Sequence, residues 1–191
     1  MFRELLRTEF HPWGELSNLQ LDQLDRHYKL LMAWNHRLNL TRILDLMDVV
    51  HLHYCESLFL STVLPPRSLK VCDLGSGAGF PGIPLAVIRP DAEVTLIESD
   101  QRKAVFLRES TRDLGNVRVL ATRYQDCYEE FDWIVSRAVA LGDLLPSRLA
   151  PNFALMLAAA ALPPGIEVTK LPWGRDRVVV VSRGTDVSRE T

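Results

Sequence analysis

The chain has 191 residues, of which 47% are hydrophobic and 24% charged, and its formal net charge is −2 at pH 7. This length suits one α/β domain with a small addition, and the composition excludes a disordered or fibrous protein. The slightly negative charge argues against a surface coated with nucleic-acid-binding charge, but it leaves local basic patches open.

The expected compartment is the cytoplasm. Cys55, Cys72 and Cys127 form neither a C-x-x-C pair nor an even disulfide framework, which is typical of reduced, packed thiols. No apolar run is long enough to span a bilayer, and the first residues do not resemble a signal peptide. We therefore expect no membrane partner.

The first segment that predicts regular structure is an amphipathic helix after residue 17. Residues 1–17 show little periodicity, and Pro12-Trp13-Gly14 is expected to break any earlier helix. From Ser17-Asn18, a suitable cap, apolar side chains recur at helical spacing up to a turn near residues 35–41: Leu21, Leu24, Tyr28, Leu31 and Leu38.

A second amphipathic helix is predicted over residues 48–63, and Pro65-Pro66 ends it. The chain therefore divides into an N-terminal helical cap, residues 1–66, and one compact sheet-containing unit, residues 67–191.

Histidines on the second helix raise the question of a metal site. His51, His53 and Cys55 alternate, and residues two apart do not share a helix face, so they predict no metal. His53 does share a face with Glu56 and Ser57. It either forms a local hydrogen bond or faces the ligand cleft described next.

Residues 71–82 are the most informative stretch. An apolar run leads to three alternating glycines, Gly75, Gly77 and Gly79, and an apolar helical segment follows, so the order is strand, tight loop and helix. Glycines let a ligand approach the backbone, and the N–H groups that open the helix point toward it. Glu98 ends the next apolar run, nineteen residues after Gly79, where a carboxylate accepts the ribose hydroxyls of an adenosine ligand.

The pattern D-x-G-x-G-x-G distinguishes between nucleoside cofactors. Asp73 precedes the glycines, and Phe80 stands where a dinucleotide fingerprint would have its last glycine. An acid here repels a diphosphate but can hold the ammonium of an amino-acid group. The loop therefore favours S-adenosylmethionine, with Ser76 among the loop residues that contact it; an NAD oxidoreductase and a turn that binds nothing are the weaker alternatives.

Strands and helices then alternate. Strands are expected over 94–97, 117–121, 131–136 and 153–157, with helices over 99–112 and 141–149 and with Val105, Phe106 and Leu107 facing inward. Residues 166–171 and 178–181 form an antiparallel pair. The expected fold is a doubly wound, mostly parallel Rossmann-like sheet with this C-terminal hairpin, and its ligands lie at the carboxyl ends of strands one, two and four.

Two further groups lie just after strands. Arg137 follows strand four, where side chains face the reactive end of the cofactor; the alternative is a surface arginine paired with Asp143. Arg123, Tyr124 and Gln125 follow strand three and should border adenine.

The chain resembles the bacterial ribosomal RNA small subunit methyltransferase G family, also called the glucose-inhibited division protein B family. The resemblance covers residues 21–140, and its most specific piece is the glycine loop running into Phe80-Pro81-Gly82-Ile83-Pro84. Its other pieces are Trp34-Asn35, Asn39-Leu40-Thr41, His53 with Glu56-Ser57, Arg102-Lys103, Phe106-Leu107, Arg123 and Ser136-Arg137-Ala138.

The resemblance implies methyl transfer from S-adenosylmethionine to N7 of a guanine in 16S ribosomal RNA, by a monomer whose partner is that RNA or a small-subunit precursor. Catalytic or RNA contacts are then expected from Arg137, Arg123 and Asn39. Guanine N7 has an in-plane lone pair, so no base has to deprotonate it; the enzyme must orient an unstacked base.

The sequence departs from the family after residue 150. Met156 stands where the family has a lysine, and the chain passes almost directly to the last hairpin. Either an RNA contact is lost, or Met156 is a buried strand residue and Arg175 or Arg177 has taken its place. The alternatives are therefore a cofactor-binding relative with lost or changed activity, or a methyltransferase acting on a small molecule or a protein.

Overall fold

The computed structural model describes residues 1–137, 148–162, 168–174 and 176–183. Its seven-stranded sheet has the order β3-β2-β1-β4-β5-β7-β6. β1 to β5 run parallel to one another, β7 pairs antiparallel with β5, and β6 pairs antiparallel with β7. The bounds are β1 Lys70–Leu74, β2 Glu93–Ile97, β3 Val117–Leu120, β4 Trp133–Ser136, β5 Asn152–Ala158, β6 Val168–Lys170 and β7 Arg177–Ser182. The predicted α/β sheet with a C-terminal hairpin is confirmed.

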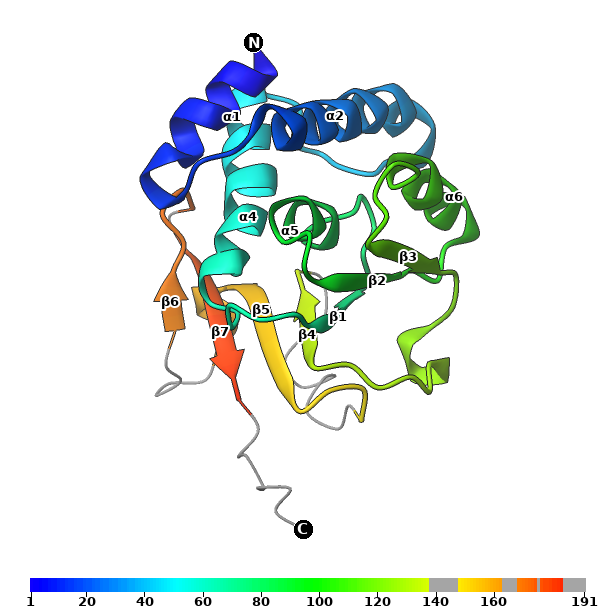
Figure 1. Ribbon diagram of the computed structural model, residues 1–191. Helices are drawn as coiled ribbons and strands as arrows, with labels where there is room; N and C mark the ends of the chain where they lie inside the picture. The colour runs from blue at the N-terminus through cyan, green and yellow to red at the C-terminus, as the bar shows by residue number, and fades with distance from the viewer. Residues whose placement is uncertain (138–147, 163–167, 175, 184–191) are drawn as a thin grey trace.

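The described helices gather on one side of this sheet (Figure 1). α5 and α6 follow β1 and β2, and α2 packs across both of them. The helices are α1 Phe2–Phe10, α2 Asn18–Leu38, α3 Leu46–Val49, α4 Glu56–Phe59, α5 Gly82–Ile88 and α6 Gln101–Ser110, with short turns η1 His11–Trp13, η3 Leu60–Thr62, η4 Tyr124–Asp126 and η5 Ala159–Ala161. Most of the predicted helix over 141–149 falls outside the described residues.

A π-helical turn, η2 (Val50–Cys55), joins α3 to α4 in one continuous helical segment. This segment confirms the helix expected over residues 48–63. A π turn holds more residues than an α turn and often occurs at functional sites. His53 lies within it. Within the described ranges, no helix has the length and hydropathy needed to cross a bilayer.

Residues 1–17 contain α1 although their periodicity is weak, and α1 ends at Phe10, so the helix stops before Pro12 as expected. Phe2, Leu6 and Phe10 are buried at intervals of four residues, which places them on one helix face. The Phe2 ring stacks on Tyr28 of α2 with its centroid 4.4 Å away. The nine-residue segment is too short to show helical periodicity clearly, and packing stabilises it.

α2 begins as predicted. Ser17 accepts a hydrogen bond from the Gln20 backbone N–H (3.2 Å), and the Gln20 side chain accepts one from Ser17 N–H (2.9 Å), so the two form a capping box. The inward face expected for α6 needs one correction. Phe106 and Leu107 are buried, but Val105 is 51% exposed, because three consecutive helical residues cannot share one face.

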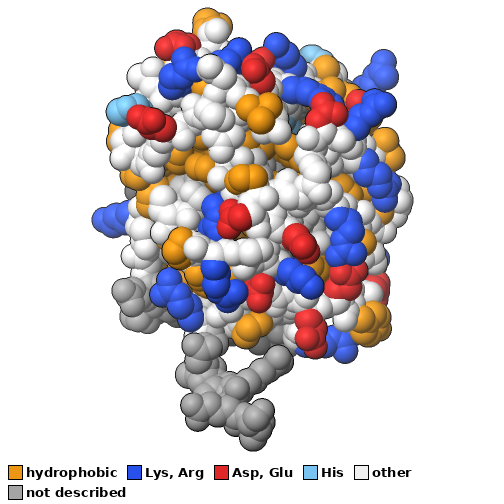
Figure 2. All heavy atoms as spheres, in the orientation of Figure 1, with side chains coloured by type: hydrophobic (Ala, Val, Ile, Leu, Met, Phe, Trp, Pro, Cys, Tyr) orange, Lys and Arg blue, Asp and Glu red, His pale blue; other side chains and the backbone are white. Residues whose placement is uncertain are grey.

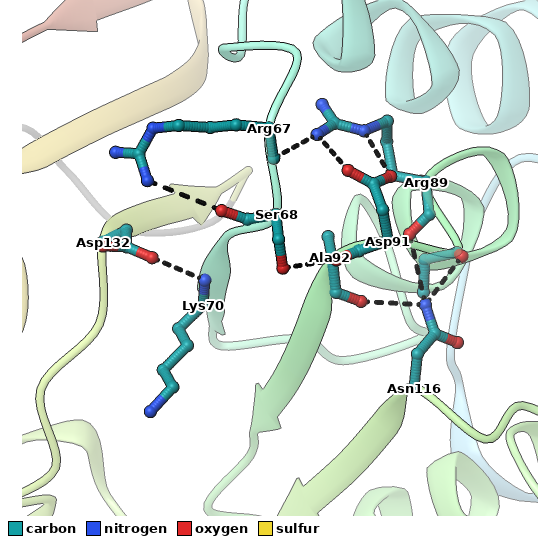
Figure 3. A network of polar contacts seen from close by, with 9 residues as sticks. Arg67, Ser68, Lys70, Arg89, Asp91, Ala92, Asn116 and Asp132 are labelled. Atoms are coloured by element: carbon teal, nitrogen blue, oxygen red, sulfur yellow. Dashed lines mark hydrogen bonds and ion pairs between the residues drawn. The ribbon is translucent and has the colours of Figure 1, made fainter.

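Polar contacts fix the amino ends of the strands, at the edge opposite the glycine loop (Figure 3). The Asp132 carboxylate accepts a hydrogen bond from Lys70 N–H (2.7 Å), which ties the segment before β4 to the start of β1. The Asn116 amide, just before β3, donates to three carbonyls at the α5–β2 connection, those of Ala86, Arg89 and Ala92. These contacts anchor three parallel strands in register and leave the carboxyl ends available for a ligand.

Met156 lies in the middle of β5, between β4 and β7, and is 1% exposed. It belongs to the main hydrophobic core, together with its partner on β7, Val179. Met156 is thus a buried strand residue and is not exposed to solvent, where RNA would lie. Arg175 falls outside the described residues, and Arg177 lies opposite Ala158, two residue pairs further along the same ladder.

We predict that Met156→Lys lowers the free energy of unfolding by about 3–5 kcal/mol, because a buried ammonium loses several pKa units at about 1.4 kcal/mol each. Met156→Leu, which conserves volume, is the control and should cost less than about 1.5 kcal/mol. Denaturant titration of both variants tests this. A lysine variant as stable as wild type would show that the side chain reaches water or a carboxylate.

Candidate functional site

The candidate site lies at the carboxyl ends of β1, β2 and β3. β1 is central: the chain continues to β2 and β3 on one side, whereas β4 and β5 lie on the other. Ligands of open parallel sheets bind at such a point of reversal, because the connections diverge there and leave a crevice. The glycine loop between β1 and α5 fills the edge of this crevice.

The glycine loop is tied to the second strand. Gly75 N–H and Ser76 N–H both donate to the Ile97 carbonyl, at 2.9 and 3.2 Å. Gly75, Gly77 and Gly79 all have positive φ, and at Gly77 (φ +56°) the nearest atom to an added Cβ would be 3.7 Å away. A side chain at Gly77 would therefore strain the backbone and fill open space beside the loop, which is the space that a ligand needs.

Asp73 is completely buried at the end of β1. Its Oδ2 accepts a hydrogen bond from Gly82 N–H (2.9 Å), and Gly82 must be glycine because an added Cβ would lie 2.6 Å from that oxygen. Its Oδ1 has no hydrogen-bond partner among the described residues. Burial raises the pKa of Asp73 from 3.8 to about 7, against the effect of the Gly82 hydrogen bond. An ammonium group is the ligand chemistry that this free oxygen fits.

Glu98 connects the loop to the end of β2. Oε2 accepts a hydrogen bond from Gly77 N–H (2.9 Å) and Oε1 accepts one from Asp100 N–H (2.8 Å). The residue is 7% exposed, and each carboxylate oxygen can still accept a second hydrogen bond. The remaining capacity suits a pair of ribose hydroxyls.

A cleft of about 330 Å³ continues from the loop toward β3. The residues predicted to border adenine line it together with the loop and the ends of β2 and β3: Gly75, Ile97, Ser99, Thr122, Arg123, Tyr124 and Gln125. Arg123 is exposed at this cleft. The structure therefore brings the β1 loop and the β3 loop to one site, as predicted.

Arg137, at the end of β4, faces the cap. Nη1 lies 2.7 Å from His53 Nδ1 and 3.0 Å from the Leu52 carbonyl, and its guanidinium lies over the Phe80 ring, 5.5 Å from the centroid. Burial lowers the pKa of Arg137 to about 10, so it stays charged at neutral pH. Asp143, the alternative partner considered from the sequence, lies outside the described residues.

His53 is buried and does not line the cleft described above; its carbonyl accepts a local hydrogen bond from the Ser57 hydroxyl. Its ring stacks on Phe80 with the centroids 4.6 Å apart, and its second nitrogen, Nε2, lies 2.7 Å from Thr41 Oγ1. Burial lowers its pKa to about 3, with Arg137 as the next cause, so the ring is neutral. Within the described ranges, no cluster of His, Cys, Asp and Glu could hold a metal ion.

A buried ion pair borders this region. Glu56 of α4 is fully buried, and both of its oxygens accept hydrogen bonds from Arg177 Nε of β7, at 2.8 and 2.7 Å. Burial raises the pKa of Glu56, whereas the charge of Arg177 lowers it. The pair joins the cap to the hairpin across a distance of 121 residues in sequence, so Arg177 has a structural partner.

Sequence reasoning missed His27. It is fully buried; Nε2 lies 2.9 Å from the Ala78 carbonyl of the glycine loop, and Nδ1 lies 2.9 Å from Tyr54 Oη. The signal was present, because His27 falls three residues after Leu24 and four before Leu31, on the apolar face of α2.

Asn39 ends α2 in the left-handed conformation (φ 49°), with an exposed side chain. The neighbouring Asn35 instead makes both hydrogen bonds to the Thr41 backbone (2.9 and 3.0 Å). The loop after α2 thus reaches the site through Thr41.

The fold is similar to those of solved methyltransferases. A SAM dependent methyltransferase from Aquifex aeolicus matches 70% of this chain and 91% of its own, with a TM-score of 0.54 and 17% identity. A ribosomal protein L11 methylase from Lactobacillus delbrueckii subsp. bulgaricus matches 70% and 80%, with a TM-score of 0.55 and 16% identity. At this identity the likeness shows the fold alone.

Sequence relatives are closer. Ribosomal RNA small subunit methyltransferase G of Roseiflexus sp. (strain RS-1) is 38% identical over 146 residues, which are 72% of this chain and 62% of that protein. The same-named protein of Halorhodospira halophila is 40% identical over 149 residues, 74% of this chain and 70% of its own. The chain spans 56–62% of the length of three relatives with this name, from Roseiflexus sp. (strain RS-1), Roseiflexus castenholzii and Desulforamulus reducens. The family model for rRNA small subunit methyltransferase G matches residues 20–151, and the chain therefore belongs to that family.

Proposed function

We propose that the protein is an S-adenosylmethionine-dependent methyltransferase that methylates N7 of a guanine in 16S ribosomal RNA, in the cytoplasm. The observation that carries this proposal is the free, fully buried Asp73 Oδ1 beside the positive-φ glycine loop, in a chain of this family. The oxygen fits an ammonium and not a phosphate, which separates this cofactor from a dinucleotide.

Different residues of the site contact different parts of the cofactor. Asp73 holds the amino group of its methionine part, the loop residues Gly75, Ser76, Gly77, Gly79 and Phe80 surround that part, and Glu98 accepts the ribose hydroxyls. Tyr124 and Gln125 lie beside adenine in the cleft described above. When bound, the cofactor supplies an electrophilic methyl group next to a positively charged sulfur.

Positioning accounts for the chemistry. Guanine N7 attacks with a lone pair that needs no deprotonation, so the protein must hold the base in line, and orientation alone can supply several kcal/mol of the barrier. Arg137 is the charged donor at the reactive end of this crevice, because it follows β4 and lies over Phe80. We assign it to contacts with the target base or the cofactor carboxylate, and Arg123 and Asn39 to contacts with RNA.

RNA binding must be local. Basic and acidic side chains are interspersed over the face drawn in Figure 2, and the net charge of −2 supplies no long-range attraction for phosphate. Arg37 and Arg42, on the α2 end and the following loop, are exposed near Thr41 and supplement Arg123. We therefore infer that a folded RNA site presented by a small-subunit precursor binds better than unstructured RNA.

A cofactor-binding relative without activity is the second candidate, because Met156 stands where the resemblance to the family places a lysine. Tritiated S-adenosylmethionine, incubated with undermethylated small subunits and separately with naked 16S RNA, tests the two. Methyl incorporation at a guanine N7 supports the enzyme. Tight cofactor binding with no incorporation into either substrate supports the inactive relative.

We predict that cofactor affinity depends on pH through Asp73. Its pKa of about 7 means that binding an ammonium requires loss of a proton below pH 7, so affinity should fall about tenfold per pH unit from pH 7 to 5.5. The same raised pKa makes the free protein less stable as pH rises toward 7. Calorimetry at several pH values measures the affinity. Asp73→Asn should bind more weakly at pH 7 and lose the pH dependence; an unchanged pH dependence would contradict the assignment.

Glu98→Ala is expected to weaken S-adenosylmethionine binding by about 1.5–3 kcal/mol, the range for losing hydrogen bonds to a charged group. Calorimetry at pH 7.5 measures it, and thermal melting controls for the loop contact with Gly77. NAD should not bind either protein. Unchanged affinity for S-adenosylmethionine, or binding of NAD, would refute the cofactor assignment.

Arg137→Ala should lower methyl transfer about 100-fold, since a misplaced reactant costs on that scale. Thermal melting should change much less. Arg118→Ala is the matched control, because Arg118 pairs with Glu129 at the opposite end of the sheet. If Arg137→Ala kept full activity, or merely unfolded, Arg137 would be a structural residue.

A further inference from the structure

The His53 ring has a different partner at each nitrogen, and together these partners define its tautomer. Nδ1 lies 2.7 Å from Arg137 Nη1, and an arginine nitrogen can only donate, so Nδ1 is the unprotonated acceptor. Nε2 therefore carries the single proton of the neutral ring and donates it to Thr41 Oγ1 at 2.7 Å. A ring with the proton on Nδ1 would set two donors against each other.

Thr41 is itself held in place. Its Oγ1 also accepts a hydrogen bond from Ile43 N–H (3.0 Å), so both lone pairs of the hydroxyl oxygen are in use. Its backbone N–H and carbonyl are bonded to the Asn35 side chain at 2.9 and 3.0 Å. The acceptor that selects the tautomer is thus fixed to the end of α2.

Arg137 is constrained by the other side of the ring. The two hydrogens of Nη1 go to His53 Nδ1 and the Leu52 carbonyl, which sets the plane of the guanidinium over Phe80. No hydrogen bond from Nε or Nη2 to the described residues accompanies these two contacts. The low pKa of His53 agrees with a neutral ring, because burial and, after it, the charge of Arg137 both disfavour protonation.

We propose that His53 is a positioning residue, held by Thr41 as the Nε2–H tautomer, that orients the guanidinium of Arg137 over Phe80 for contact with a ligand at the glycine loop. The activity tests of this role depend on the proposed function. The tautomer of His53 and the geometry of Arg137 do not depend on it. The inference extends the site from the sheet into the cap: Asn35, Thr41 and His53 transmit the position of α2 to Arg137.

Two amide variants separate positioning from packing. His53→Asn places an acceptor near the Nδ1 position and keeps the contact with Arg137, whereas His53→Gln places its amide near Nε2 and keeps only the contact with Thr41. Both lose the ring that stacks on Phe80. We expect kcat for His53→Gln to fall about 10- to 100-fold further than for His53→Asn, with similar binding of S-adenosylmethionine. Equal losses would mean that the ring only packs and would overturn the proposal.

Thr41 variants provide a gentler test. Thr41→Val removes the acceptor for Nε2–H and should lower kcat, and Thr41→Ser should restore it. Thr111→Val is the control, because the Thr111 hydroxyl donates to the Leu107 carbonyl of α6, away from the site. The proposal fails if kcat of Thr41→Val equals that of the wild type and kcat of Thr41→Ser is no higher than that of Thr41→Val.

Nitrogen-15 NMR of the histidine rings decides the tautomer without any activity. Wild-type protein should show His53 as neutral Nε2–H at pH 7, with slowly exchanging Arg137 guanidinium protons that become fast in Thr41→Val. An Nδ1–H or charged His53 overturns the proposal even if the enzyme is active. The expected spectrum without methyl transfer to any RNA would instead reject the proposed function alone.

Discussion

A carboxylate buried at the end of the central strand is the constraint on which the rest of the site depends. Asp73 has no exposed surface, and one of its carboxylate oxygens accepts a hydrogen bond from the Gly82 N–H. Water cannot solvate the charge, so its surroundings must be shaped for it: Gly82 can carry no side chain, and Arg137 contributes positive potential. Gly82 therefore has an electrostatic role, because its backbone N–H donates the hydrogen bond that stabilises the Asp73 carboxylate, and a side chain at this position would displace it.

The same principle applies to the buried carboxylate of Glu56. Burying Glu56 is tolerable only because Arg177 pairs with it, and such a pair contributes more to register than to net stability. It connects a cap helix to the last hairpin, so the two ends of the chain are aligned at the place where Arg137 meets His53. Arg137, over Phe80, is therefore held by contacts from the cap, which restrict its position beside the glycine loop.

Short-range patterns in the sequence predicted the sheet, the glycine loop and Glu98, because each depends on residue types at fixed spacing along one strand, loop or helix. They failed where partners are distant: α1 is stabilised by contacts of Phe2 and Leu6 that its own nine residues do not reveal. For the same reason Met156 left two possibilities open, which only pairing on both sides of β5 resolved. The contact between Arg137 and His53, 84 residues apart, leaves no local trace in either segment.

The π-helical turn that carries His53 has a consequence for how this family can vary. Each residue of an α-helix turns the chain by about 100°, so deleting one residue from Val50–Cys55 would rotate everything after it by that angle. Val49, packed in the core before the turn, and Glu56, paired with Arg177 after it, could then no longer keep their present directions together. Insertions and deletions should therefore be tolerated in the loops on either side of this segment but not within it. The length of the segment is then more strictly constrained than its amino-acid composition.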